Sequence, residues 1–224
     1  MKLLALETAT DACSAALLID CEITSRFEVA PRRHTELILP MCEQLLSDAG
    51  FELAQLDAVA FGRGPGSFTG VRIATGVAQG IAFASQIPTV PVSTLAALAQ
   101  RAIREGGKSH VVAALDARMG EVYWGCYERD DSGNARVHGE EHVTPPQDVW
   151  ASREPAWYGV GSGWASYAAI LAEKLQAGGY DGGALPHAQH VAELAAIAFR
   201  GGLAVPAEQA APVYLRYRVT AGRE

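Results

Sequence analysis

Residues 62–72 read GRGPGSFTGVR, and the rest of the chain is organised around this stretch. It joins an apolar run, Leu56–Phe61, that predicts a buried strand to a segment, Ile73–Ser85, that predicts a helix. Glycines and a proline this close together are typical of a tight, specially shaped loop. Thr69 is a candidate N-cap, because its hydroxyl can accept a free amide of the first helical turn.

A turn of this kind directs several backbone amides at one point, so it can hold an anion. The Walker pattern, however, needs a lysine followed by serine or threonine, and the dinucleotide pattern needs a third glycine. Both are missing here. We therefore favour a structural or interface loop, with direct phosphate binding as the alternative.

The helix after the loop is expected to carry little side-chain volume. Its small residues are Gly70, Ala74, Gly76, Ala78, Gly80, Ala82 and Ala84. A glycine inside a helix costs about 1 kcal/mol relative to alanine. The composition therefore predicts that another backbone approaches this helix closely.

The two halves of the chain repeat one order of predicted elements. The first half is expected to hold strands at 3–9, 13–19, 22–29, 56–61 and 89–92, with helices at 34–49, 73–85 and 94–104. The second is expected to hold strands at 110–116, 121–128, 137–143 and 158–160, with helices at 162–176 and 190–200. The two halves also correspond in sequence: residues 3–18 (LLALETATDACSAALL) match residues 111–127 (VVAALDARMGEVYWGCY), and Glu7 corresponds to Asp116.

This repetition predicts a duplicated α/β fold with two related subdomains, 1–105 and 106–224, each with a mixed sheet and flanking helices. The polar, flexible stretch 106–109 is the expected boundary. Paired halves of this shape resemble the plan of the actin-like ATPase and sugar-kinase (ASKHA) superfamily.

Composition bounds the function further. The 224 residues carry a net charge of −7, which argues against a stand-alone nucleic-acid binder. The cysteines form no C-x-x-C pair, and Cys13, Cys21 and Cys42 are predicted to be buried free thiols. We expect neither a signal peptide nor a membrane span, and hence a cytoplasmic protein.

Four segments carry a resemblance to a known family. GRGPGSFTGVRIATGVAQGIA and the opening LLALETATDACSAAL closely resemble the bacterial TsaB (YeaZ) family of tRNA threonylcarbamoyladenosine biosynthesis proteins, and HTELILPMCEQLLSDAG and IPTVPVSTLAALA fit the same family. The resemblance is strong over the first half and loose over the second. It implies an actin-like fold in an accessory, non-catalytic subunit.

The resemblance also implies partners. In that family the subunit pairs with the catalytic paralogue TsaD, and the ATPase TsaE joins them. The complex transfers a threonylcarbamoyl group onto the adenosine beside the anticodon of tRNA. This implies no cofactor for the isolated chain, ATP or ADP only within the complex, tRNA contact through the complex, and a homodimer as an alternative use of the same surface.

The predicted partner interface lies on the helices at 34–49 and 70–85. Its residues are His34, Ile38, Leu45, Gly66, Ser67, Thr69, Gly70, Val71, Arg72, Ile73, Ala74, Val77 and Ala78. Val71→Arg is expected to break pairing without unfolding the chain, because it would place an unpaired charge in a close-packed interface.

Weaker candidates lie elsewhere. Nucleotide phosphates would meet Thr8, Thr10, Asp11 and Asp116 in the two hairpins, although ordinary tight turns are favoured. The basic, aromatic tail offers Arg216 and Arg218 to RNA, with packing of the tail on the protein as the simpler alternative. The pairs His138/His142 and His187/His190 are predicted to lie in a solvated hairpin and at a helix start.

The competing hypothesis is an enzyme in its own right, either an actin-like phosphotransferase or a metallopeptidase. TsaD carries a His-x-x-x-His pair, and two histidines at this spacing share one helix face and can bind a metal. The matching stretch here, Val92–Leu98, has no histidine, carboxylate or cysteine. We therefore favour the accessory subunit over the enzyme.

Overall fold

Two five-stranded sheets with the same strand order form the framework of the computed structural model, which describes residues 1–152 and 156–216. The first sheet has the order β3-β2-β1-β4-β5, with β1 Lys2–Glu7, β2 Ala12–Ile19, β3 Glu22–Val29, β4 Ala58–Gly62 and β5 Thr89–Val92. The second has the order β10-β9-β6-β7-β8, with β6 His110–Arg118, β7 Glu121–Arg129, β8 Ala135–Thr144, β9 Tyr158–Val160 and β10 Tyr180–Asp181.

The central strands show that the sheets are two copies of one design. Strand β1 pairs antiparallel with β2 and parallel with β4, and β6 pairs antiparallel with β7 and parallel with β9. The duplicated α/β architecture with two mixed sheets, predicted from the repeated element order, is confirmed.

Within the described residues, five α-helices cover the sheets. They are α1 His34–Ala49, α2 Phe68–Ser85, α3 Thr94–Arg104, α4 Ser162–Leu175 and α5 Ala188–Arg200. Short 3-10 turns lie at Leu53–Gln55, Pro146–Asp148 and Ala207–Gln209. Helix α1 has the predicted bounds and ends at Gly50, whose φ of 69° is the left-handed conformation that glycine adopts easily.

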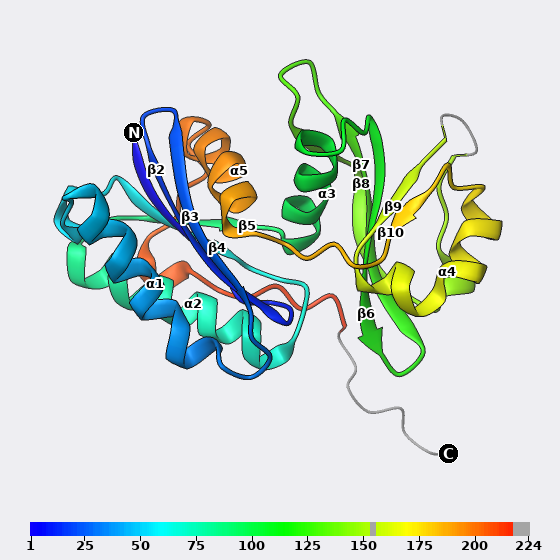
Figure 1. Cartoon of the computed structure of the whole chain (residues 1–224), viewed down its shortest axis with the longest axis horizontal. Helices are drawn as coiled ribbons and strands as arrows, with labels where there is room; N and C mark the ends of the chain where they lie inside the picture. Colours follow the sequence, from blue (N-terminus) through cyan, green and yellow to red (C-terminus); the bar gives the residue numbers. More distant parts are fainter. Residues whose placement is uncertain (153–155, 217–224) are drawn as a thin grey trace.

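Alternating side chains bind each sheet to helices on both faces. In β1, Leu4 and Leu6 pack with α1 and α2, whereas Leu3 and Ala5 pack with α5. In the second sheet, the face that includes Val111 packs against α3, and the opposite face packs against α4. Helices α5 and α3 therefore meet in the middle of the molecule, between the two sheets (Figure 1).

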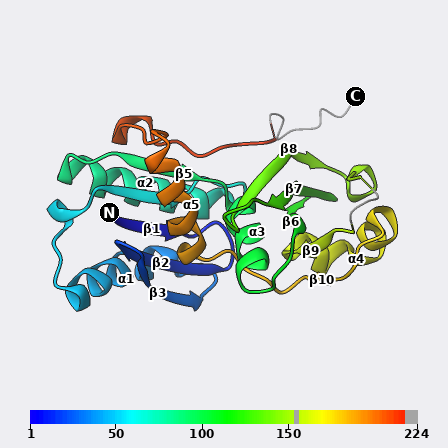
Figure 2. The ribbon, with the colours of Figure 1, turned by 90° about the horizontal axis from the view of Figure 1, so that it is seen from above.

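The central helices do not follow the expected boundary at 105/106. That boundary separates the two sheets, but α3 precedes it and packs on the second sheet. Helix α5 follows it and packs on the first sheet (Figure 2). Each half thus receives one covering helix from the other half of the sequence.

The C-terminal segment 201–216 ties the halves together a second time. Val205 pairs with Thr89, and the Gln79 amide donates to the Ala210 carbonyl at 2.7 Å. Further on, the Val213 amide donates to the carbonyl of Arg63 at 2.8 Å. The segment then runs from the first half toward the second (Figures 1 and 2).

The structure differs from the sequence prediction in the N-cap of α2 and in one cysteine. The N-cap of α2 is Ser67 and not Thr69, because the Ser67 hydroxyl accepts the Gly70 amide and the helix already includes Thr69. Cys13 and Cys42 are buried as predicted, but Cys21 is exposed at the end of the β2–β3 hairpin. Among the described residues, no helix is both long and apolar enough to cross a membrane.

Candidate partner-binding surface

The glycine loop packs against the first hairpin of its own chain. A Cβ on Gly70 would overlap the Thr8 carbonyl oxygen, and a Cβ on Gly66 would overlap the Ala9 carbonyl. The Ser67 amide donates to that Ala9 oxygen at 2.7 Å. These glycines therefore serve the close approach of two segments of one chain, which supports a structural role for the loop.

Helix α2 has two different faces. Its buried face consists of Gly70, Val71, Ala74, Thr75, Ala78, Ile81 and Ala82. On its outer face, a Cβ added to Gly76 or Gly80 would meet nothing within 4 Å. No close approach by another part of the described chain requires glycine at these two positions, where it lowers helix propensity.

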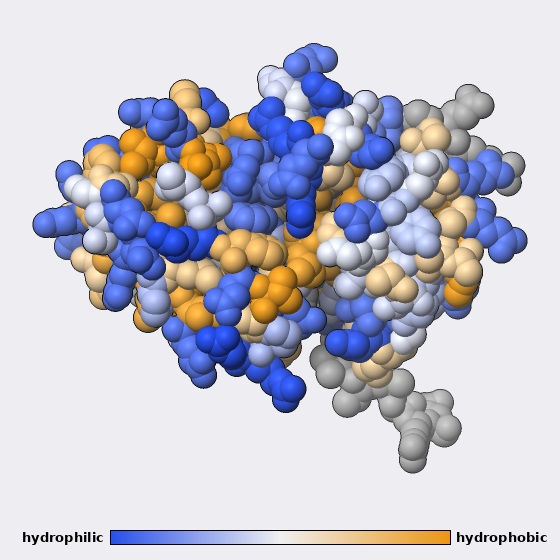
Figure 3. All heavy atoms as spheres, in the orientation of Figure 1, coloured by the Kyte–Doolittle hydropathy of each residue, from blue (hydrophilic) through white to orange (hydrophobic). Residues whose placement is uncertain are grey.

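Large apolar side chains flank this small-residue face. Phe68 is 64% exposed and Phe83 is 77% exposed, near the two ends of α2. On neighbouring α1, Leu39 is 46% exposed. Over α1 and α2, hydrophobic residues lie among hydrophilic ones on the surface in Figure 3. Helices α1 and α2 therefore present a mixed surface with two bare glycines and exposed apolar side chains.

An aromatic and cationic cluster marks one end of this surface. The Arg72 guanidinium lies 3.3 Å from the centre of the Phe68 ring and 5.4 Å from that of Tyr214. The two rings are 6.2 Å apart. This stacking holds Arg72 on the outer side of α2, where it is exposed.

The predicted interface residues divide between this surface and the core. Ser67, Thr69 and Arg72 are exposed, and Gly66, Ile73 and Val77 are partly exposed. The others are buried within the chain: His34, Ile38, Leu45, Gly70, Val71, Ala74 and Ala78.

The expectation for Val71→Arg is corrected by this burial. Val71 is only 2% exposed and lies on the core side of α2. An arginine there would place a charge in the protein's own core, so the variant would lose its fold and not only its pairing. Sequence periodicity identified the apolar stripes of α1 and α2, but the first sheet already covers those stripes.

Phe68, Phe83 and Leu39 were missed by the sequence prediction. Their signal was available, since each is a large apolar residue that lies outside the buried stripe of its helix. Such residues mark a second contact surface more directly than the residues of the stripe itself.

Three of the four hairpin residues considered for nucleotide binding, Thr8, Thr10 and Asp116, have hydrogen-bond partners within the chain. The Thr8 hydroxyl donates to the Gly70 carbonyl at 2.7 Å, and the Thr10 hydroxyl accepts the Ala12 amide at 3.4 Å. Asp116 accepts the Arg118 amide at 2.8 Å. Asp11 is exposed. Thr8 is fully buried, so its hydroxyl supports the glycine loop.

Glu7 is the most unusual titratable group near these hairpins. It is fully buried at the end of β1, where it accepts the Ala9 amide at 2.7 Å and the Thr94 hydroxyl at 3.0 Å. Burial raises its pKa to about 7, although these hydrogen bonds act in the opposite direction. Since Thr94 begins α3, Glu7 links the first sheet to the helix that covers the second.

The histidines have mainly structural surroundings. His187 caps α5 by accepting the Gln189 amide, and burial lowers its pKa to about 4. His190 is buried between the carboxylates of Glu105 and Glu193. His138 is exposed on β8, and His142 lies against Trp124. Within residues 1–152 and 156–216, no three His, Cys, Asp or Glu side chains gather as a metal site would require.

Residues Val92–Leu98, considered from the sequence as the place of a metal site, form the end of β5 and the start of α3. The Ser93 hydroxyl accepts the Ala96 amide as its N-cap, and Thr94 bonds to Glu7. In the tail, the Arg216 guanidinium donates to the Ala117 carbonyl at 3.2 Å and to the Glu121 carboxylate. Arg216 is therefore engaged by the β6–β7 turn, and Arg218 lies outside the described residues.

Comparison with known proteins identifies the family. Residues 26–205 match the family model described as TsaD: tRNA N6-adenosine threonylcarbamoyltransferase. The chain is 43% identical to the tRNA threonylcarbamoyladenosine biosynthesis protein TsaB of Escherichia coli, across 98% of this chain and 96% of that protein. With the Haemophilus influenzae protein of the same name it shares 41% identity, across 98% and 95%. The solved structure of YeaZ from Pseudomonas aeruginosa is 51% identical, with a TM-score of 0.91 over 96% of this chain and 99% of that one. The chain therefore belongs to the TsaB (YeaZ) family of tRNA threonylcarbamoyladenosine biosynthesis proteins.

Proposed function

We propose that this chain is a non-catalytic, cytoplasmic subunit of the tRNA threonylcarbamoyladenosine modification machinery, and that it acts by pairing through α1 and α2 with a TsaD-like catalytic paralogue. A TsaE-like ATPase joins the pair. Transfer RNA and any ATP or ADP are bound by the complex and not by this chain alone.

The outer face of α2 is the observation that carries this proposal. Gly76 and Gly80 face open space there, between the exposed rings of Phe68 and Phe83. Glycine in a helix is costly unless a second backbone uses the room that it leaves. A helix of a partner chain would fill this room and cover the exposed apolar side chains.

Helix α1 extends the same surface. Leu39 is exposed on it, whereas Ile38 and Leu45 point into the core. A partner with its own pair of helices would meet α1 and α2 together and form a four-helix contact. A second copy of this chain offers the same two helices, so self-association and pairing with the paralogue compete for one surface.

The structural use of Ser93 and Thr94 supports a non-catalytic role. At the place where TsaD carries metal-binding histidines, these residues cap α3 and hold Glu7. Their side chains therefore stabilise the junction between the two halves.

The test is the solution mass of the purified chain, alone and mixed with the TsaD-like paralogue of the same organism, by light scattering. We expect self-association alone and a one-to-one heterodimer in the mixture. A chain that stays monomeric and ignores the paralogue would refute the proposal, and nucleotide and metal binding would then be measured.

Gly80→Arg provides the matched variant. It places a large charged side chain on the open face of α2, where its Cβ would meet no atom of the described residues within 4 Å. We expect pairing to weaken about a hundredfold or more, as for a disrupted interface centre. Ala169→Arg, which adds the same charge to the exposed side of α4, is the control and should pair normally. Equal pairing by both variants would place the interface elsewhere.

A further inference from the structure

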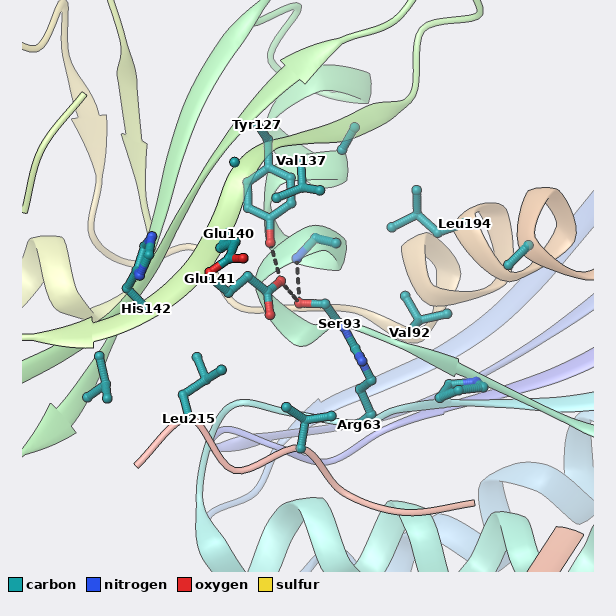
Figure 4. Close-up of a pocket in the computed structure, with 17 residues that line it drawn as sticks. Arg63, Val92, Ser93, Tyr127, Val137, Glu140, Glu141, His142, Leu194 and Leu215 are labelled. Carbon is teal, nitrogen blue, oxygen red and sulfur yellow. Dashed lines mark hydrogen bonds between the residues drawn. The ribbon is translucent and has the colours of Figure 1, made fainter. Parts of the chain in front are cut away.

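A cavity of about 760 Å³ lies where the two halves meet, away from the outer faces of α1 and α2. It is bounded by the end of β5, by β7 and β8, by α5 and by the C-terminal segment (Figure 4). Both sheets and the segment that ties them together therefore contribute to its wall. The site is independent of the partner-binding surface.

The Arg63 side chain lines this cavity and has no hydrogen-bond or ion-pair partner in the part of the chain that the structure describes. Arg63 follows β4, and its backbone is fixed on both sides, because its amide donates to the Val92 carbonyl and its carbonyl accepts the Val213 amide, both at 2.8 Å. Its Nε is buried and has no hydrogen-bond partner among the described residues. Its guanidinium also forms no ion pair with any carboxylate in that part of the chain. A half-buried guanidinium without a partner favours an anionic group of a ligand.

A carboxylate is held in place in the same cavity. One oxygen of Glu141 accepts both the Ser93 hydroxyl and the Tyr127 hydroxyl. Burial and the neighbouring Glu141 charge raise the pKa of Tyr127 well above its ordinary value, so its hydroxyl remains a donor. The other oxygen of Glu141 receives no hydrogen bond within residues 1–152 and 156–216. It is therefore available to a donor group of a ligand.

The geometry leaves the two charges apart. In Figure 4 Arg63 lies below Ser93 and Glu141, with Tyr127 above them. Arg63 and Glu141 line one cavity but are more than the 4.0 Å of an ion pair from each other. The rest of the lining includes the apolar side chains of Val92, Val137, Leu194, Val213 and Leu215, together with Glu140 and His142.

We propose that this cavity binds a zwitterionic small molecule of the α-amino-acid class. Its carboxylate would bind the Arg63 guanidinium, its ammonium would donate to the free oxygen of Glu141, and its side chain would rest on the apolar wall. A polyanion such as a nucleoside triphosphate fits less well, because Glu140 and Glu141 would repel it. A purely apolar ligand would leave both charges unsatisfied.

The first test uses the unaltered chain and compounds that differ by one charge. L-Leucine, N-acetyl-L-leucine (no ammonium) and 3-methylbutylamine (no carboxylate) are titrated into the protein, with binding followed by calorimetry and by ligand-observed NMR. We expect saturable binding of leucine with a Kd of about 1 mM or tighter. Both analogues should bind at least about tenfold more weakly, since each leaves one protein charge unpaired.

Two variants locate the site. Arg63→Gln should weaken leucine binding at least about tenfold while leaving the binding of 3-methylbutylamine unchanged. Glu141→Gln should likewise weaken leucine binding at least about tenfold, while leaving the binding of N-acetyl-L-leucine unchanged. Both need circular dichroism spectra and melting curves like those of the unaltered chain, and the analogue series stands by itself should Glu141→Gln fail to fold. Absence of saturable leucine binding up to about 10 mM, or equal binding of leucine and either analogue, would overturn the proposal.

Discussion

Glu7→Gln should abolish the part of the pH dependence of folding stability that comes from ionisation of the Glu7 carboxyl. The Glu7 carboxyl is fully buried, and no cationic side chain of the described residues lies within ion-pairing distance of it. Its pKa is raised from 4.5 to about 7. The folded chain therefore holds this proton over a pH range in which the unfolded chain has released it.

The sign follows from proton linkage. Well below pH 4.5 the carboxyl is protonated in both states, and stability no longer depends on its titration. Between pH 4.5 and about 7 only the folded chain holds the proton, so stability falls as the pH rises. A shift of this size corresponds to about 3 kcal/mol in total, and about 2 to 3 kcal/mol of it should appear between roughly pH 5 and pH 8.

The assay is urea unfolding of the wild type and the variant at several pH values across that range. Glutamine has nearly the same shape and still accepts the Ala9 amide, so the variant should gain stability relative to the wild type as the pH rises. Other titrating groups are shared and cancel in the comparison. The control is Glu173→Gln at an exposed position of α4. A stability difference between Glu7→Gln and the wild type that does not change with pH would refute the reasoning.

The remaining predictions concern the two faces of α2 and the anchoring of the C-terminal segment. Gly70→Ala should destabilise the chain by about 1 to 3 kcal/mol, because the new methyl overlaps the Thr8 carbonyl, whereas Gly76→Ala on the open face of the same helix should stabilise it by up to about 1 kcal/mol. Urea unfolding of the two variants checks both, and equal effects would contradict the assignment of the two faces. Arg216→Gln should release the end of the C-terminal segment, beyond Val213, from the β6–β7 turn. Limited proteolysis would show this as faster cleavage near residues 214–216, and an unchanged cleavage rate would count against the anchoring role.

The sheets and most helices were predictable because their local patterns are strong. Helix α1 combines a regular apolar stripe with a glycine stop, and both bounds were correct. The N-cap of α2 was not, since Ser67 and Thr69 are both good capping residues two positions apart and only the geometry of the loop selects Ser67. Cys21 follows an apolar strand, and the reversal of the chain immediately after that strand exposes it.

Tertiary placement was harder to predict for a physical reason. The apolar stripe of α3 shows that the helix packs on something, but the stripe is equally suited to either sheet. The same limit applied to the partner surface, where Ile38 and Val71 were expected to face another chain and instead face the first sheet. The cavity at Arg63 and Glu141 joins residues far apart in the sequence, and no spacing pattern brings them together.

The crossed placement of α3 and α5 makes the two halves of the sequence dependent on each other. A fragment ending near Gly106 would carry α3 without the second sheet, and the face of its own sheet that α5 covers would be exposed. The remaining fragment would carry α5 without the first sheet, and the face of the second sheet that α3 covers would be exposed. Neither fragment should fold alone, yet the two expressed together should reassemble, since each supplies the helix that the other lacks. A single break in the exposed 105–107 turn should therefore leave the molecule in one piece, and the chain is suited to use as a split reporter.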